Sequence, residues 1–208
     1  MKKDIKSLLL IITCTIILFL AFYFPNIIIE KENAYNFLSA FAANVQKKEE
    51  IIFYNFEINY KMTGLISPNI LYTSTKGDIE SKFLSELVRN KPLLFYRYAD
   101  VNCNICYETE IKALQEAFVY TPELTGILCS YIIERDLINF KRLNVIKLSM
   151  YRIDSDAFNW EVEQNGNPYY FVLHPDMKIS HIYVPNKDYP ALNKQYLEGV
   201  KRFLQDEN

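Results

Sequence analysis

The stretch KPLLFYRYADVNCNICYETEIKALQEAF, from Lys91 to Phe118, decides the fold that this sequence predicts. Its apolar run LLFY suits a buried strand, and a short polar turn then leads into Cys103-Asn104-Ile105-Cys106. Behind the cysteines, apolar residues recur at i, i+4, i+7 and i+11, which predicts a helix that packs by one face against a sheet. These residues are Tyr107, Ile111, Leu114 and Phe118. A cysteine pair at the start of a helix that follows a strand is well placed for redox chemistry.

The predicted helix gives the two sulfurs different roles. If Asp100 or Asn102 caps the helix, Cys103 lies in its first turn, where unpaired N–H groups and the helix dipole favour the thiolate. We therefore expect Cys103 to be the nucleophile. Cys106 lies three residues on and on the same helical face, so we expect it to be the resolving thiol, which breaks the mixed disulfide between Cys103 and a substrate.

The composition limits the classes of protein that this chain can belong to. Its 208 residues are 50% hydrophobic, which is enough to bury a full core in one domain with appendages. A net charge of -2 gives no polycationic face, so nucleic acid is not an expected partner. Of the four cysteines, only Cys103 and Cys106 are close in sequence, unlike the framework of a disulfide-stapled domain. A structural zinc site would need a second pair or nearby histidines, so we expect no metal.

Residues 1–25 have the pattern of a membrane anchor. Three lysines precede an uncharged, almost wholly apolar segment, SLLLIITCTIILFLAFYF, at residues 7–24. About 18 residues at the helical rise reach roughly 27 Å, close to the hydrocarbon thickness of a thin bilayer. The lysines orient the segment with its N-terminus in the cytoplasm, and no small-x-small cleavage site ends the apolar run. We therefore expect an uncleaved, single-pass anchor, with the remainder of the chain exported.

Residues 26–65 are expected to form a helical stalk or linker. The segment has no proline, and no glycine before Gly64, and its apolar residues fall at roughly helical intervals. A heptad register would put Lys48, Asn55 and Asn59 at core positions, so folding back onto the domain is favoured over pairing as a coiled coil.

Residues 66–208 are expected to form the globular domain, in which strands and helices alternate before a final hairpin and helix. The expected strands lie at residues 69–78, 93–96, 126–133, 145–153, 169–173 and 179–184, and the expected helices at 79–90, 103–118, 135–144 and 189–204. Such an order predicts an α/β fold with a mixed central sheet covered by helices on both faces.

This order of elements resembles the thioredoxin fold, and more closely the bacterial membrane-anchored thioredoxin-like proteins of the TlpA and redoxin type. The resemblance covers about Ser67 to Phe203 and depends on two motifs, the CxxC pair and Asn167-Pro168-Tyr169. It implies a redox-active disulfide between Cys103 and Cys106 and no further cofactor. It also implies that the anchor lies in a bacterial inner membrane with the domain in the periplasm. It also implies a cis-proline at Pro168 that, with Asn167, presents backbone to a substrate chain.

The chain departs from this family pattern near the cysteines. Asn102 stands where tryptophan is common, and Asn104-Ile105 where Gly-Pro or a similar pair is common. Related anchored proteins often carry a proton-relaying glutamate three residues beyond the second cysteine, but Thr109 holds that place here. Its neighbours Glu108 and Glu110 are expected to be solvated, with the relay of a proton for Cys106 as the alternative for either.

Three further residues near these motifs have simple structural interpretations. Arg97 is expected to be a surface ion-pairing arginine, with stabilisation of a thiolate as the alternative. Cys129 lies in an apolar run and is expected to be a core thiol. His181 is expected to find its partners within the hairpin.

Two functional hypotheses follow from the sequence. The first is a membrane-anchored, periplasm-facing thiol-disulfide oxidoreductase that acts through its CxxC pair on the thiols and disulfides of envelope proteins, with an upstream redox partner. The alternative is a thioredoxin-fold binding or scaffold module of the cell envelope, in which the cysteine pair is not catalytic.

Overall fold

The computed structural model of this chain describes residues 2–74, 81–99, 104–130, 134–164 and 166–207. For residues 2–12, 14–30, 71, 74, 81, 104–106 and 134 it describes the backbone alone. The chain divides into two compact units, residues 1–50 and residues 51–208, which are considered separately below.

The first unit is helical throughout its described length. It belongs to α1, which spans Lys2–Met62, and every side chain of residues 31–50 is exposed. Among the residues that the structure describes, no helix carries a stretch long and apolar enough to cross a bilayer. The anchor at residues 7–24 stays a prediction from the sequence.

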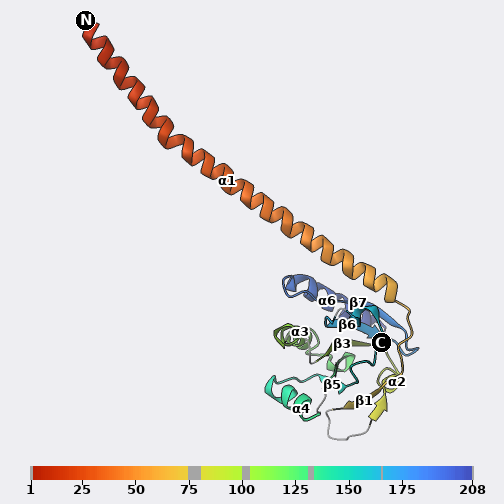
Figure 1. Ribbon diagram of the computed structural model, residues 1–208. Coiled ribbons are helices and arrows are strands. Elements are labelled where there is room, and N and C mark those ends of the chain that lie inside the picture. The colour runs from red at the N-terminus through yellow and green to blue at the C-terminus, as the bar shows by residue number, and fades with distance from the viewer. Residues whose placement is uncertain (1, 75–80, 100–103, 131–133, 165, 208) are drawn as a thin grey trace. The chain divides into compact units, whose positions relative to one another are not determined.

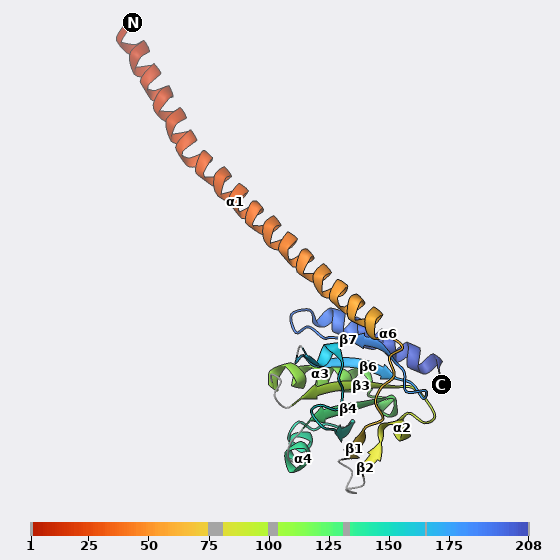
Figure 2. The same ribbon diagram turned by 45° about the vertical axis from the view of Figure 1, so that its right-hand side comes forward.

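A mixed sheet forms the centre of the second unit. Within the described residues its strand order is β2-β1-β5-β4-β3-β6-β7, with β3 between β4 and β6 (Figures 1 and 2). The strand β3 runs parallel to β4 and antiparallel to β6, and β4 runs parallel to β5. The strands are β1 (Leu71–Ser74), β2 (Ser81–Phe83), β3 (Leu93–Ala99), β4 (Thr125–Ser130), β5 (Ser149–Arg152), β6 (Tyr169–Leu173) and β7 (Ile179–Tyr183).

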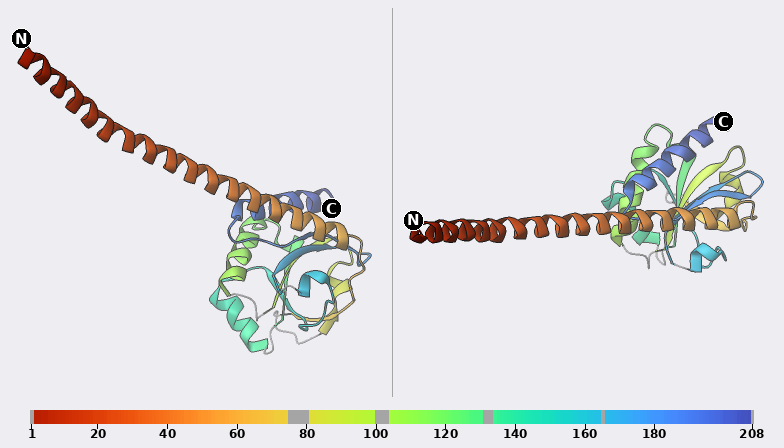
Figure 3. Two further views of the ribbon diagram at one scale, coloured as in Figure 1. Left: turned by 45° about the horizontal axis from the view of Figure 1, so that its top comes forward. Right: turned by 90° about the horizontal axis from the view of Figure 1, so that it is seen from above.

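Helices cover both faces of this sheet, as the sequence predicts. The connections β3-α3-β4 and β4-α4-β5 step the same way across the sheet, so their common handedness puts α3 and α4 on one face. The closing helix α6 lies beside α3 on that face (Figure 3). The helices are α2 (Leu84–Leu87), α3 (Asn104–Ala117), α4 (Glu134–Leu143), α5 (Glu161–Gln164) and α6 (Pro190–Asp206), with a short 3-10 turn at Pro122–Leu124.

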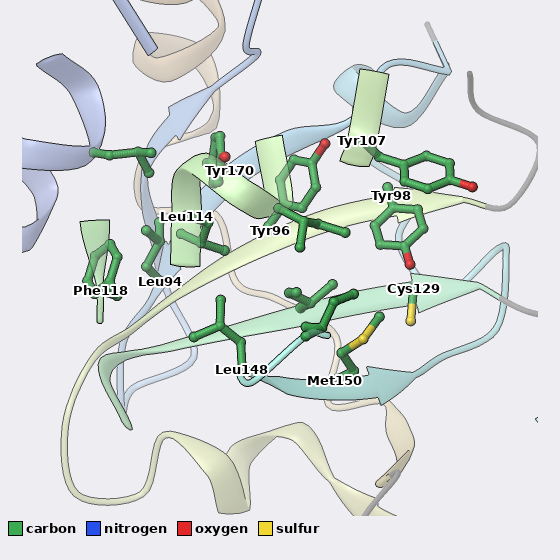
Figure 4. Packing of buried hydrophobic residues seen from close by; sticks show 14 of the residues in the cluster. Leu94, Tyr96, Tyr98, Tyr107, Leu114, Phe118, Cys129, Leu148, Met150 and Tyr170 are labelled. Carbon is green, nitrogen blue, oxygen red and sulfur yellow. The ribbon is translucent and has the colours of Figure 1, made fainter. Parts of the chain in front are cut away.

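Each face of the sheet has its own apolar core, because side chains alternate along a strand. From β3, Leu94, Tyr96 and Tyr98 enter the core beneath α3, α4 and α6, where the ring of Tyr98 stacks on that of Tyr107 at 4.6 Å (Figure 4). Leu93 and Phe95 enter the opposite core with α2 and the segment around α5.

The helix expected over residues 79–90 is wrong in its first half. Residues 81–83 form β2, which pairs with β1 so that Thr73 lies opposite Ser81. Among the described residues 81–90, only Leu84–Leu87 are helical, and the Phe83 N–H donates to the Glu86 carboxylate at 3.0 Å. The backbone pairing available from β1 outweighs the helical propensity of this short segment.

The last part of α1, residues 51–62, belongs to the second unit and covers the outer edge of β7. Ile58 and Met62 are each 2% exposed within the core that contains α2. The Asn55 side chain accepts from the Val184 N–H at 2.6 Å and donates to the Val184 carbonyl at 3.2 Å. Asn59 accepts from the Ile182 N–H at 2.9 Å. These two asparagines take the place of a neighbouring strand, which protects an edge that could otherwise pair with another chain.

Candidate redox site

The cysteine pair lies where the end of β3 leads into α3. β3 ends at Ala99 and α3 begins at Asn104, inside the CxxC sequence, which confirms the strand predicted before the cysteines and the helix predicted behind them. Cys103 and its predicted caps, Asp100 and Asn102, lie outside the described residues. Cys106 belongs to the first turn of α3, but its side chain is also outside them.

The second motif lies at the same edge of the sheet. In the register of β3 with β6, Arg97 stands opposite Tyr169, so the link that carries Asn167 and Pro168 lies next to the C-terminal end of β3. Asn167 is exposed and Pro168 is half-buried. The expectation of a cis bond before Pro168 is wrong. The described residues, which include Asn167 and Pro168, contain no cis peptide bond. The trans form is the ordinary, lower-energy isomer of an X-Pro bond.

The two candidate proton relays differ in their environments. Glu108 is exposed, as expected, but the expectation that Glu110 is solvated is wrong, because Glu110 is 6% exposed on the face of α3 that packs towards α6. The Glu110 carboxylate accepts from the Tyr170 hydroxyl at 3.1 Å and from the Asn193 amide at 2.7 Å. Burial raises the pKa of Glu110, and these two hydrogen bonds oppose the rise only in part. Glu110 is therefore the glutamate that can hold a proton inside the fold.

Asn193 is a site residue that the sequence reasoning missed. It is 2% exposed, and its side-chain oxygen accepts from the Tyr183 hydroxyl at 2.9 Å while its amide holds Glu110. One signal was available: Asn193 lies at i-4 from Leu197 on the apolar stripe of α6, where a polar residue needs a buried partner.

A groove between α3 and α6 leads towards this carboxylate. It has a volume of about 500 Å³, and Glu110 and Asn193 are among its lining residues. Charged groups of both signs, including Glu198 and Lys201, line it as well.

Arg97 is not the surface residue that the sequence predicts. Its side chain is 1% exposed, and its Nε lies 2.9 Å from the Glu163 carboxylate. The expected ion pair is present, but it is largely buried, with the Glu163 side chain 18% exposed. No local pattern predicts this burial, because Glu163 lies 66 residues away in a polar segment.

The simple interpretations of Cys129 and His181 are confirmed. Cys129 is fully buried in the core, and its Sγ lies 3.4 Å from the Tyr151 carbonyl. His181 lies in β7, and its Nδ1 is 2.7 Å from the Ser180 hydroxyl. In the part of the chain that the structure describes, no three metal-ligating side chains come together.

No family model matches this sequence, and no curated protein matches it either. Solved structures do match the fold. A thiol:disulfide interchange protein from Bacteroides sp. superposes with a TM-score of 0.53 at 16% identity, covering 69% of this chain and 90% of the other. The thioredoxin domain of a thiol-disulfide oxidoreductase from Bacteroides vulgatus gives 0.51 at 17% identity, covering 68% and 97%. A putative protein disulfide isomerase from Bacteroides thetaiotaomicron gives 0.52 at 15% identity, covering 69% and 90%. The chain therefore has a thioredoxin-like fold.

Proposed function

We propose that this chain is a thiol-disulfide oxidoreductase that acts through Cys103 and Cys106. The observation that supports it most is the register of β3 with β6, which brings the Asn167-Pro168 link to the edge of the sheet where the chain enters the CxxC helix. In an open α/β sheet, ligands bind at the carboxyl ends of the parallel strands, and this is such an edge. A substrate polypeptide would lie along Asn167 and Pro168 there.

The proposed reaction transfers two electrons in two exchanges. The Cys103 thiolate attacks one sulfur of a substrate disulfide, which forms a mixed disulfide and releases the other sulfur as a thiolate that takes a proton from water. Cys106 then loses its proton and attacks the Cys103 sulfur, which releases the second substrate thiolate and forms the Cys103–Cys106 disulfide. An upstream redox partner returns the pair to the dithiol. The pair itself is the redox group, so no further cofactor is required.

Glu110 is the proposed acceptor for the Cys106 proton. It follows Cys106 by four residues, so both belong to one face of α3. Burial raises the pKa of its carboxyl, which suits a group that must take up and release a proton. The groove between α3 and α6 offers it a path to water. Glu108 is exposed and is not assigned this role.

The location and partners of the protein are part of the same proposal. The apolar segment at residues 7–24 would anchor the chain in the inner membrane, and the domain would meet the thiols and disulfides of envelope proteins in the periplasm.

Trapping of the mixed disulfide tests this function. In the full chain, Cys106→Ser removes the resolving thiol, so substrates should remain bound to Cys103 and separate only after reduction. Cys103→Ser is the matched control and should trap none. A titration of the wild-type chain in glutathione buffers should show a reversible two-electron couple. If the pair stays oxidised at every physiological glutathione ratio and Cys106→Ser traps nothing, the binding-module alternative is favoured instead.

A further inference from the structure

The guanidinium of Arg97 donates hydrogen bonds to several partners in the interior of the fold. Besides the Glu163 carboxylate, its guanidinium donates to the Tyr98 carbonyl at 2.9 Å, the Ser130 hydroxyl at 2.6 Å and the Ser155 carbonyl at 3.3 Å. These partners come from the end of β3, the end of β4 and the segment between β5 and α5. A single side chain thus joins the three segments that meet at the edge of the proposed site.

Through Glu163 and Tyr169, the same arginine is connected to both sides of the link that carries Asn167 and Pro168. Glu163 lies at the start of this link, and its carboxylate also accepts from the Tyr169 hydroxyl at 2.7 Å. Tyr169 lies at the end of the link and stands opposite Arg97 in the sheet. Glu163 and Tyr169, which lie on either side of this link, are therefore fixed to one largely buried ion pair.

The fold has no general need for a charge at this place. The residues of β3 before Arg97 are apolar and buried, and an apolar pair of similar volume is often as stable as a buried ion pair or more so. What the ion pair adds is direction, since the planar guanidinium holds each acceptor at a defined angle. This points to a role in the orientation of the link rather than in stability.

We propose that Arg97, acting through Glu163 and Tyr169, is a positioning residue that holds the Asn167-Pro168 link in the geometry that receives a substrate polypeptide. This inference rests on the proposed function. Arg97 does not take part in the exchange of disulfides. Its loss should therefore weaken the use of protein substrates and leave the intrinsic reactivity of the cysteines unchanged.

Tyr169→Phe and Glu163→Gln test the inference in the full chain without removal of the buried arginine. Tyr169→Phe takes away one hydroxyl and keeps the ring. The matched control is Glu161→Gln on the same helix, where the carboxylate lies on the surface, 3.5 Å from Nζ of the exposed Lys61. The probes are insulin as a protein disulfide and DTNB as a small one. Both test variants should raise KM for insulin about tenfold, with kcat and the DTNB rate within about twofold of wild type, because a link misplaced by about 1 Å can cost up to 100-fold.

Amide exchange gives a readout that does not depend on activity. The Gly166 and Asn167 amides should exchange faster in Glu163→Gln than in wild type, and at the wild-type rate in Glu161→Gln. Unchanged exchange, or insulin and DTNB rates that fall together, would overturn the positioning role. A wild-type chain that reduces neither probe would instead overturn the proposed function, and with it this inference.

Discussion

The two asparagines on the edge of β7 allow a prediction with a defined magnitude. Asn55→Ala removes the acceptor of the Val184 N–H and the donor to the Val184 carbonyl. Asn59→Ala removes the acceptor of the Ile182 N–H. Val184 is 8% and Ile182 is 2% exposed, so water reaches these groups poorly.

The expected loss follows from the donors left without partners. A buried N–H without an acceptor costs about 1–3 kcal/mol, and the further hydrogen bond that Asn55 donates is worth about 1 kcal/mol. We expect Asn55→Ala to lower the free energy of unfolding by about 2–4 kcal/mol and Asn59→Ala by about 1–3 kcal/mol. The two losses should not add fully, because both residues hold the same strand.

Urea denaturation and amide exchange of the full chain measure this loss globally and locally. The Ile182 and Val184 amides should exchange faster in the alanine variants. Asn59→Asp should restore the protection of Ile182, because the described bonds of Asn59 use its side-chain oxygen only as an acceptor. Gln46→Ala, on the exposed part of the same helix, is the control and should change stability by less than about 0.5 kcal/mol. Protection of both amides at the wild-type level in the alanine variants would refute the assignment of these side chains as an edge cap.

Three further predictions concern other parts of the fold. Because burial raises the pKa of Glu110, the folded chain holds this proton more tightly than the unfolded chain, and stability is lost as the pH rises above the unfolded value. In urea denaturation, Glu110→Gln should therefore be more stable than wild type at about pH 8 and no more stable at about pH 4. A change in stability of equal size at both pH values would contradict the burial of a titrating carboxyl. Gly126→Ala should destabilise by about 1–3 kcal/mol, because its Cβ would lie 2.8 Å from the Tyr151 ring, and an unchanged melting temperature would count against this packing. Gly199→Ala in α6 meets nothing within 4 Å and should stabilise by about 0.5–1 kcal/mol, a gain that thermal denaturation would detect.

Local sequence patterns predicted many of the helices and strands of residues 66–208. The period of the apolar residues behind Cys106 predicted α3, and the run around Cys129 predicted a strand that is buried along its whole described length. Such patterns succeed where the periodicity is strong and the segment is long. They failed at residues 79–90, where three residues pair with β1 and periodicity over so short a segment could not show it.

The sequence by itself determined the candidate chemistry: a CxxC pair between a strand and a helix, a proline before the hairpin, and glutamates on the same helix. Only the tertiary structure decided which polar groups lie inside. In the folded chain Glu110 is buried and bonded to Asn193, Arg97 pairs with Glu163, and Asn55 and Asn59 lie on the edge of β7. Each of these partnerships joins residues more than 60 positions apart. Local propensity acts over one or two turns of chain, so contacts of this kind follow from the packing of whole elements and cannot be read from neighbouring residues.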